Sequence, residues 1–352
     1  MQFPKGYCYS CFVISTGWYR EKDFASLMNL QGKNHNHHKI RGVSTSDIDE
    51  LALFQENKNR RYTQLYSGQL QGDYLEINLG KLQVFRENLN VGALIEATPA
   101  SNFVPFAALL SNRDDSNFCG KHIEQNSIIQ ATGGDWDVTF KNHLSVISAV
   151  FDRETFAHDI HLLTGEEIPN YWLISKACLT EPLALAQFAR GVNNIINVIQ
   201  AKPEVIKTEN SLRMINDTIL RLAFNALKVT TPCTEKRVNQ SKRCEGVRQV
   251  MDYLHSYGES VPTIPELCKI AKLSERNLQY GFKEYLGVTP IRYLRLLRLN
   301  GVRRDLLINR SDKNKVVDVA LNWGFIELGR FAREYRQLFK ELPSATLKKL
   351  NE

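Results

Sequence analysis

Residues 274–290 read SERNLQYGFKEYLGVTP, and residues 327–343 read ELGRFAREYRQLFKELP. In both stretches apolar side chains recur every fourth residue, a spacing that puts them on one face of a helix. They are Leu278, Phe282 and Leu286 in the first stretch and Phe331, Tyr335 and Phe339 in the second, 53 residues downstream (278 to 331). The chain therefore contains one helical pattern twice.

A shorter helical signal precedes each stretch. Residues 263–266 (TIPE) have the form of a capping box, in which a hydroxyl and a glutamate satisfy the first backbone N–H groups of a helix. Glycine at Gly324 permits the corresponding turn in the second copy. We expect these inward side chains: Leu267, Cys268 and Ala271 in the first copy, and Val317, Ala320 and Leu321 in the second. Two helices joined by a tight turn form a helix-turn-helix, and here the unit occurs twice.

The outward faces of the two longer helices are polar. Guanidinium and carboxamide groups can form bidentate hydrogen bonds with guanine and adenine edges, and glycine lets the backbone approach a phosphate. At roughly 100° per residue the outward positions are Arg276, Gln279, Tyr280 and Lys283, then Gly329, Arg333 and Arg336, with Arg330 at the margin. A plain solvated surface is the alternative for either helix alone. The duplication favours a nucleic-acid interface.

Several features of residues 245–347 carry a family resemblance. They are the run 274–290, the pair Arg298 and Leu299, and Ala320 followed by Gly324 and Phe325. This region resembles the double helix-turn-helix domain of AraC/XylS transcriptional regulators. Within that family the strings LNGVRRDLL, WGF, LGRFAREY and QLF are most similar to the regulator of ethanolamine utilisation. One departure is Lys340, which stands where the family usually has the glycine matched here by Gly287.

The resemblance implies the positions that contact DNA. The base-reading positions are Arg276, Gln279, Tyr280, Gly329, Arg330 and Arg333. Phosphate contacts are expected from Ser274, Lys283 and Arg336.

Residues 289–308 read as one helix with Thr289 as cap and Pro290 in its first turn. About 18 residues at roughly 1.5 Å each span about 27 Å, close to the spacing of successive major grooves, about 34 Å.

Charge is distributed unevenly along the 352 residues. The net charge is +7, but residues 236–352 hold 23 Lys and Arg against 13 Asp and Glu, which leaves −3 for the rest. This asymmetry favours a polyanionic partner for the last third of the chain. Seven cysteines, an odd number without regular spacing, indicate a reducing compartment and hence the cytoplasm. We expect no membrane span, because no apolar run reaches 18 residues.

Residues 1–43 are predicted to be a poorly ordered leader, and Met28 is a candidate native start. Cys8 and Cys11 form a CxxC, followed by His35, His37 and His38. A structural zinc site needs four ligands at regular spacing, so we expect neither metal nor cofactor.

Residues 44–228 are predicted to form a β-rich sensing or dimerisation domain. Residues 44–54 read as a capped helix, and short strands with regular turns follow over 62–151: 74–79, 82–86, 127–130, 136–140 and 144–151. The predicted fold class is therefore α+β, with an N-terminal β-barrel-like (cupin-like) domain and a helical layer, then an all-α double helix-turn-helix domain. His122 and His143 are too few and too separated for a metalloenzyme site. An apolar pocket could be lined by aromatic residues, but their spacing is equally that of a plain core: Tyr62, Tyr74, Phe85, Phe103, Phe106 and Trp136.

Two long helices are predicted at 182–200 and 211–228. They could pair two copies of the chain, as the resemblance suggests, or cover the barrel of their own chain, and the sequence does not choose. Residues 229–242 read as a linker, and residues 243–352 as the DNA-binding domain.

The resemblance implies a sequence-specific DNA-binding transcription regulator, more often an activator, that is not an enzyme. The N-terminal domain would act through a small-molecule effector or through a homodimer, and RNA polymerase is a further expected partner. No effector-binding residue can be named. Two alternatives remain: a DNA-repair alkyltransferase, to which Cys8 and Cys11 point, and a nonspecific DNA-binding protein.

Overall fold

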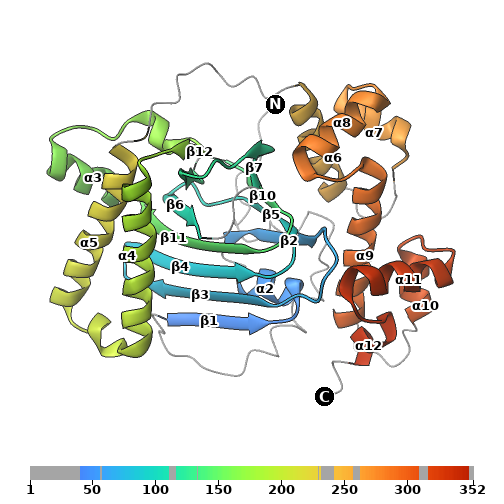
Figure 1. Cartoon of the computed structure of the whole chain (residues 1–352), viewed down its shortest axis with the longest axis horizontal. Coiled ribbons are helices and arrows are strands. Elements are labelled where there is room, and N and C mark those ends of the chain that lie inside the picture. Colours follow the sequence, from blue (N-terminus) through green and yellow to red (C-terminus); the bar gives the residue numbers. More distant parts are fainter. Residues whose placement is uncertain are drawn as a thin grey trace, which may run out of the picture. The chain divides into compact units, whose positions relative to one another are not determined.

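A computed structural model describes residues 40–55, 58–110, 116–132, 134–228, 230, 242–256, 262–308 and 316–348. They form two compact units, one rich in β-strands and one made of helices, shown in Figure 1. The predictions for Cys8, Cys11, Met28 and the histidines at 35–38 lie outside the described residues, as does most of the predicted linker.

In the described part of the first unit the strands form two antiparallel sheets. The larger has the order β1-β3-β4-β11-β6-β9-β12 and the smaller β2-β5-β10-β7-β8. The strands of the larger sheet are β1 (Ile40–Thr45), β3 (Gly72–Asn78), β4 (Leu82–Leu89), β6 (Phe103–Leu109), β9 (Ser127–Gln130), β11 (Leu144–Asp152) and β12 (Lys176–Leu179). Those of the smaller sheet are β2 (Arg60–Gln64), β5 (Ala93–Ala97), β7 (Ser116–Phe118), β8 (Lys121–His122) and β10 (Trp136–Phe140). The α+β fold class is confirmed, with two separate sheets in place of one closed barrel.

The alternation of side chains in the larger sheet gives it two buried faces. One face packs against the smaller sheet through residues such as Phe85, Leu109 and Ile129. The other face carries Val84, Phe106 and similar residues and packs against helices. Because successive side chains in a strand point to opposite faces, each strand supplies both layers.

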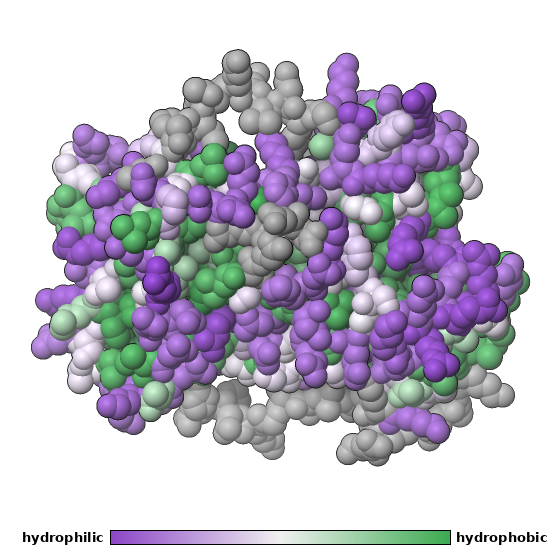
Figure 2. Space-filling view, in the orientation of Figure 1, coloured by the Kyte–Doolittle hydropathy of each residue, from purple (hydrophilic) through white to green (hydrophobic). Residues whose placement is uncertain are grey.

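The helices of this unit are α2 (Ile48–Phe54), α3 (Arg153–Thr164), η3 (Asn170–Leu173), α4 (Pro182–Ala201), η4 (Pro203–Ile206) and α5 (Glu209–Lys228). Helices α4 and α5 lie side by side along the larger sheet in Figure 1 and bury Phe188, Val192 and Ala223 against it. They therefore cover the sheet of their own chain. Apolar side chains also gather on the surface of this region in Figure 2. Leu183 of α4 and Met214 of α5 are exposed. Pairing of two copies through these helices stays a prediction.

The start of the first unit differs from the sequence prediction. The residues at 44–45 belong to strand β1, and the helix begins only at Ile48. Asp47 is the cap, because its carboxylate accepts hydrogen bonds from the backbone N–H groups of Asp49 and Glu50. Strand β1 pairs with β3, so it also includes the last residues assigned to the leader.

The described residues of the second unit form seven helices: α6 (Lys242–Ser256), α7 (Ile264–Ala271), α8 (Glu275–Leu286), α9 (Pro290–Ile308), α10 (Val316–Asn322), α11 (Leu328–Phe339) and α12 (Pro343–Lys348). Helices α6, α7 and α8 pack together, and α10 and α12 pack on α9. The predicted double helix-turn-helix is thus present, with α9 between its copies. The predicted inward residues of the two longer helices are all buried.

One part of the inward face of α10 was predicted wrongly. Val317 and Leu321 are exposed, whereas Val319 and Ala320 are buried. With only seven residues in α10, two apolar faces have similar sequence patterns, and packing against α9 selects one of them.

Candidate nucleic-acid interface and cavity between the sheets

The two turns between the paired helices have the same hydrogen bonds. After α7 the N–H of Lys272 donates to Lys269 O and that of Leu273 to Cys268 O. After α10 the N–H of Gly324 donates to Leu321 O and that of Phe325 to Ala320 O. This pair of bonds is a Schellman motif, in which one residue adopts left-handed φ. That residue is Lys272 (φ 52°) in the first copy and Gly324 (φ 74°) in the second.

The second turn is one residue longer than the first. Lys272 and Gly324 are equivalent by hydrogen bonding and stand 52 residues apart (272 to 324), whereas the inward residues of α8 and α11 stand 53 apart. The extra residue is Ile326, whose side chain is 85% exposed. The insertion therefore lies at the surface and leaves both helix pairs intact.

The outward face of α8 is accessible. Arg276, Gln279, Tyr280 and Lys283 are all exposed, as the sequence predicted. The Arg276 guanidinium lies over the Tyr280 ring at 5.6 Å, and Gln279 Nε2 donates to Glu275 Oε1 at 3.2 Å. Ser274 caps the helix by accepting from the N–H of Asn277 at 3.4 Å. Ser274 is exposed at the helix N-terminus, where backbone N–H groups and the helix dipole favour an anion.

The outward face of α11 carries a different chemistry. Gly329, Arg330, Arg333 and Arg336 are exposed. Arg330 Nε donates to Glu334 at 3.0 Å, and its Nη1 lies 3.8 Å from Glu327. The hydrogen bond to Glu334 raises the pKa of Arg330. Within the described part of the chain, Arg333 and Arg336 have no such carboxylate partner. They are therefore more available to a polyanion than Arg330.

Glu334 connects the second recognition helix to α9. It also forms an ion pair with Arg295. A second ion pair joins Arg303 of α9 to Glu341, just after α11. These contacts tie the middle of α11 and the residues just after it to α9, so the outward arginines project from a supported helix.

Helix α9 forms as predicted and begins with the expected cap. Thr289 Oγ1 accepts from the N–H of Arg292 at 3.4 Å. Gly301 allows α10 to approach α9, because a Cβ at this position would lie 2.2 Å from the Trp323 ring. The Trp323 indole N–H donates to Asp305 Oδ2 at 2.7 Å. Lys340, where the family usually has glycine, ends α11 with left-handed φ of 61°.

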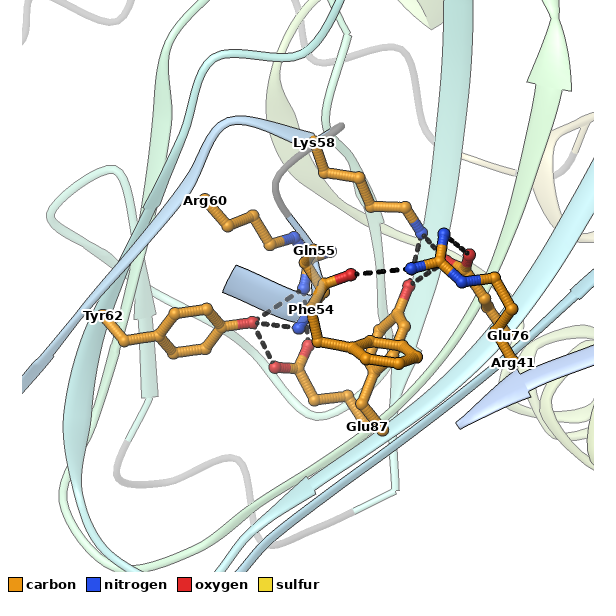
Figure 3. Close-up of polar contacts among 9 residues, drawn as sticks. Arg41, Phe54, Gln55, Lys58, Arg60, Tyr62, Glu76 and Glu87 are labelled. Carbon is orange, nitrogen blue, oxygen red and sulfur yellow. Dashed lines mark hydrogen bonds and ion pairs between the residues drawn. The ribbon is translucent and has the colours of Figure 1, made fainter. Parts of the chain in front are cut away.

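The first unit holds a cluster of charged side chains between its sheets, shown in Figure 3. Arg60 of β2 pairs with Glu87 of β4 at 2.6 Å, and the Tyr62 hydroxyl donates to the other oxygen of Glu87 at 2.5 Å. Gln55 Nε2 donates to the Tyr62 hydroxyl at 2.7 Å. Only 7% of the Arg60 side chain and 1% of the Glu87 side chain are exposed. The ion pair thus bridges the two sheets.

A second half of the cluster is centred on Glu76 of β3. Lys58 Nζ lies 2.9 Å from Glu76, and Arg41 Nη1 lies 3.5 Å from its other oxygen. The Tyr74 hydroxyl donates to Glu76 at 2.9 Å and accepts from Lys58. Both halves contact the Phe85 ring, with Lys58 Nζ at 4.5 Å and the Arg60 guanidinium at 5.0 Å from its centroid. Each buried cation therefore faces a carboxylate.

Burial shifts the ionisation of this cluster. Desolvation lowers the pKa of Lys58 to about 8, although Glu76 opposes the shift. Desolvation raises the pKa of Tyr62, and nearby Glu87 adds to the effect. Burial alone would lower the pKa of Arg60, but the oxygens of Tyr62 and Glu87 outweigh it and raise the pKa. Arg60 therefore stays charged inside the protein.

An apolar cavity of ≈ 60 Å³ lies between the sheets beside this cluster. Arg60 and Glu87 line one part of it, and the rest of its wall is almost entirely apolar. Trp136 also lines it, and its Nε1–H is buried with no acceptor among the described residues. Of the six aromatic candidates, Phe85 and Trp136 line the cavity, Tyr62 and Tyr74 belong to the charge cluster, Phe106 lies in the helix-side core and Phe103 is exposed.

The sequence prediction missed the charge cluster. The sequence pattern that could have indicated this cluster is an aromatic residue two positions from a charged one. It occurs in three strands: Arg60 and Tyr62, Tyr74 and Glu76, Phe85 and Glu87. Residues two apart in a strand share a face, so each pair points the same way. His122 and His143 are both exposed. The described residues contain no group of three or more His, Cys, Asp or Glu that could hold a metal ion, and no helix among them could cross a membrane.

Comparison with known proteins places the strongest similarity in the second unit. Residues 267–349 match the family described as "Helix-turn-helix domain". The chain is 38% identical over 102 residues to a probable thc operon regulatory protein of Rhodococcus erythropolis, covering 29% of this chain and 31% of that protein. It is 32% identical over 108 residues to a XylDLEGF operon transcriptional activator of Pseudomonas putida, covering 31% and 34%. The matched segment thus spans about a third of each of these relatives.

Among solved structures, the chain is similar to the AraC-like transcriptional activator CuxR. The match covers 74% of this chain and 94% of the CuxR chain. The sequence identity is 14% and the TM-score is 0.37. The sequence similarity of residues 267–349 and the repeated helix pairs agree that the second unit is a helix-turn-helix domain like those of operon regulators.

Proposed function

We propose that this protein is a sequence-specific DNA-binding transcription regulator and, more narrowly, an activator. The observation that carries the proposal is the repeated helix-turn-helix, whose second helices α8 and α11 each present four exposed positions outward. Arginine and glutamine can read base edges in a major groove, and lysine or arginine contacts to phosphates supply affinity. Regulation is supported by the similarity of this domain to those of operon regulatory proteins.

We propose that some side chains of the two recognition helices read bases and that others contact phosphates. We assign base reading to Arg276, Gln279 and Tyr280 in α8 and to Gly329 and Arg333 in α11. Arg330 completes the base-reading set, but it must leave Glu334 to reach a base, so we expect a smaller contribution from it. Ser274, Lys283 and Arg336 are assigned to phosphates.

The first unit is proposed to control DNA binding through an effector, through pairing of two chains, or both. The cavity between the sheets offers a place for an effector, and exposed Leu183, Val198 and Met214 on α4 and α5 offer apolar surface for a second copy. RNA polymerase is the further partner expected of an activator, and the cytoplasm is the expected location. The likeness to the regulator of ethanolamine utilisation rests on short strings of sequence in the second unit, so it names ethanolamine as a candidate effector without assigning it to the cavity of the first unit.

Two rival functions have direct tests. The alkyltransferase reading depends on Cys8 and Cys11, which lie outside the described residues, and it requires bound zinc. Metal analysis of the full chain and of a Cys8→Ser variant decides it: stoichiometric zinc that is lost in the variant supports the enzyme. A nonspecific DNA-binding protein would bind with affinity that does not depend on sequence.

In vitro selection of binding sites from random duplexes tests the proposed function. At about 0.15 M salt nonspecific electrostatic binding is weakened. We expect the full chain to enrich a motif with two contacted blocks about one helical turn apart. The control is a double variant, Arg276→Ala with Arg333→Ala, which keeps the buried residues and should lose the motif. Equal recovery of all sequences by the unaltered chain would contradict the proposal.

A further inference from the structure

The cavity between the sheets has a wall that specifies what can occupy it. Its lining is apolar except for four residues: Arg60, Glu87, Trp136 and Ser148. The Ser148 hydroxyl donates to Phe106 O at 2.9 Å, so its proton is already used. Arg60 and Glu87 are paired with each other. The remaining polar group is the indole N–H of Trp136.

That indole N–H lacks an acceptor among the described residues. An indole nitrogen can only donate, and a buried donor without an acceptor is costly. Trp172 also has a buried N–H without an acceptor, but it lies in the core on the helix side of the larger sheet and does not line this cavity. Trp136 therefore differs from Trp172 in forming part of the cavity wall.

The charges around the cavity argue against a charged ligand. Each buried cation of the cluster already faces a carboxylate, Arg60 with Glu87 and Lys58 with Glu76. A carboxylate or ammonium ligand would have to separate one of these pairs or remain buried without a partner, and both are unfavourable. The balance of charge thus selects for neutral molecules.

The volume limits the size of the ligand. A water-sized sphere occupies about 10–15 Å³. A cavity of ≈ 60 Å³ therefore holds roughly four to six non-hydrogen atoms without rearrangement.

We propose that this cavity binds a small uncharged molecule with an apolar body and one hydrogen-bond acceptor, such as a short ketone, aldehyde, ester or ether. The Trp136 ring would turn slightly so that its indole N–H donates to the acceptor, and the apolar body would contact residues such as Ala107, Leu109 and Val146. Its role as an effector rests on the proposed function, but the binding is measurable without DNA. Ethanolamine, which is cationic at neutral pH, is predicted not to bind here.

Indole N–H signals in NMR spectra of full-length protein labelled with ¹⁵N-tryptophan report on the proposal directly. The chain has four tryptophans, so the spectrum is simple, and a Trp136→Phe variant identifies the Trp136 signal by its loss. Butanone is the neutral probe, propionate the anionic probe and ethanolamine the cationic probe. A ligand of about five non-hydrogen atoms cannot bind more tightly than roughly the micromolar range, so the titration extends to tens of millimolar.

We expect butanone to shift the Trp136 signal downfield and saturably, while the signals of Trp172 and Trp323 stay in place. An Ala107→Leu variant, which fills the cavity, should weaken the apparent affinity at least tenfold, and its unchanged Trp172 and Trp323 signals would show that it is folded. Three outcomes would overturn the inference: no saturable shift with butanone, an equal shift at Trp172, or saturation by propionate or ethanolamine at lower concentration than by butanone.

Discussion

The two units of this protein place their charged side chains in opposite ways. In the first unit Lys58, Arg60, Glu76 and Glu87 lie between two sheets and pair with one another. In the second unit the arginines and the one lysine proposed to contact DNA, Lys283, point outward from α8 and α11. A buried ion pair contributes little net stability, because desolvation offsets the attraction between its charges. The interior cluster therefore indicates a functional site. The outward charges remain available to a large anion.

A finer difference separates the two recognition helices. Both rest on the same pattern of buried residues, but α8 presents arginine, glutamine, tyrosine and lysine, whereas α11 presents a glycine and three arginines, one of them held by Glu334. The two copies thus share a buried pattern but differ in their outward faces. We therefore expect each helix to contact a different block of DNA.

The largest expected effect is on the buried ion pair. Arg60→Met leaves Glu87 buried without its cation, and removing one partner of such a pair costs about 3–5 kcal/mol of unfolding free energy. Arg333→Met, a matched change at an exposed site, should change that free energy by less than about 0.5 kcal/mol. Urea unfolding measures both. Similar losses of unfolding free energy in the two variants would contradict the claim that the buried charges, unlike the outward ones, depend on their partners.

Lys58 should make stability depend on pH. Because its pKa is lowered to about 8 in the folded protein, the unfolded chain binds more protons between about pH 8 and 10, so stability should rise with pH there. At 1.36 kcal/mol for each pKa unit, the rise is about 2–3 kcal/mol. Above about pH 10 the raised pKa values of Tyr62 and Tyr74 act in the opposite sense.

Lys58→Met isolates this contribution. The difference in unfolding free energy between the unaltered chain and the variant should grow in favour of the unaltered chain from pH 8 to 10. Unfolding titrations at several pH values measure it. A difference that stays constant with pH would show that burial does not lower the pKa of Lys58.

Within the recognition helices, Arg333 should matter more than Arg330. Arg333→Ala is expected to cost about 1–3 kcal/mol on the preferred site and to relax the preference at one base position. Arg330→Ala should cost less, because this side chain gives up its contact with Glu334 to bind DNA. Competition binding with single-base variants of the site compares them. A uniform loss over all sequences would reassign Arg333 to a phosphate.

Lys283→Ala is expected to weaken DNA binding without changing the base preference, unlike Arg333→Ala. Lys283→Ala should weaken binding to all sequences alike and make the slope of log affinity against log salt shallower by about 1. Titrations from about 0.05 to 0.2 M salt provide the slope. An unchanged slope with a loss at one base position would make Lys283 a base reader.

The smallest effect tests the equivalence of the two turns. Lys272 holds the left-handed position that Gly324 holds in the second copy, and left-handed φ costs a non-glycine residue about 1–2 kcal/mol. Since glycine loses more backbone entropy, Lys272→Gly should stabilise the protein by at most about 1 kcal/mol, and Gly324→Ala should destabilise it by a similar amount. Thermal unfolding of both variants measures the effects, and the same sign in both would contradict the equivalence.

The parts of the fold that sequence predicted are those with local signals. Helix α9 begins at Pro290 and ends at Ile308 as expected, because Thr289 and Pro290 form a recognisable start. The outward positions of α8 and α11 follow from helical geometry alone. The ion pair of Arg330 with Glu334 was not predicted, although four residues is the usual separation for such a pair on one helix face.

The charge cluster could not be predicted in the same way. Arg60 and Glu87 are 27 residues apart and belong to different sheets, so their contact depends on how the two sheets pack. Strands β2 and β5, which position Arg60, were themselves not identified individually. The position of the cavity depends on the same packing.

The central claim is that α8 and α11 read different blocks of one DNA site. Parallel site selection with the unaltered chain, Arg276→Ala and Arg333→Ala tests it most directly. We predict two blocks about one helical turn apart for the unaltered chain, with one block degraded by Arg276→Ala and the other by Arg333→Ala. Degradation of the same block by both variants, or of neither, would contradict the claim.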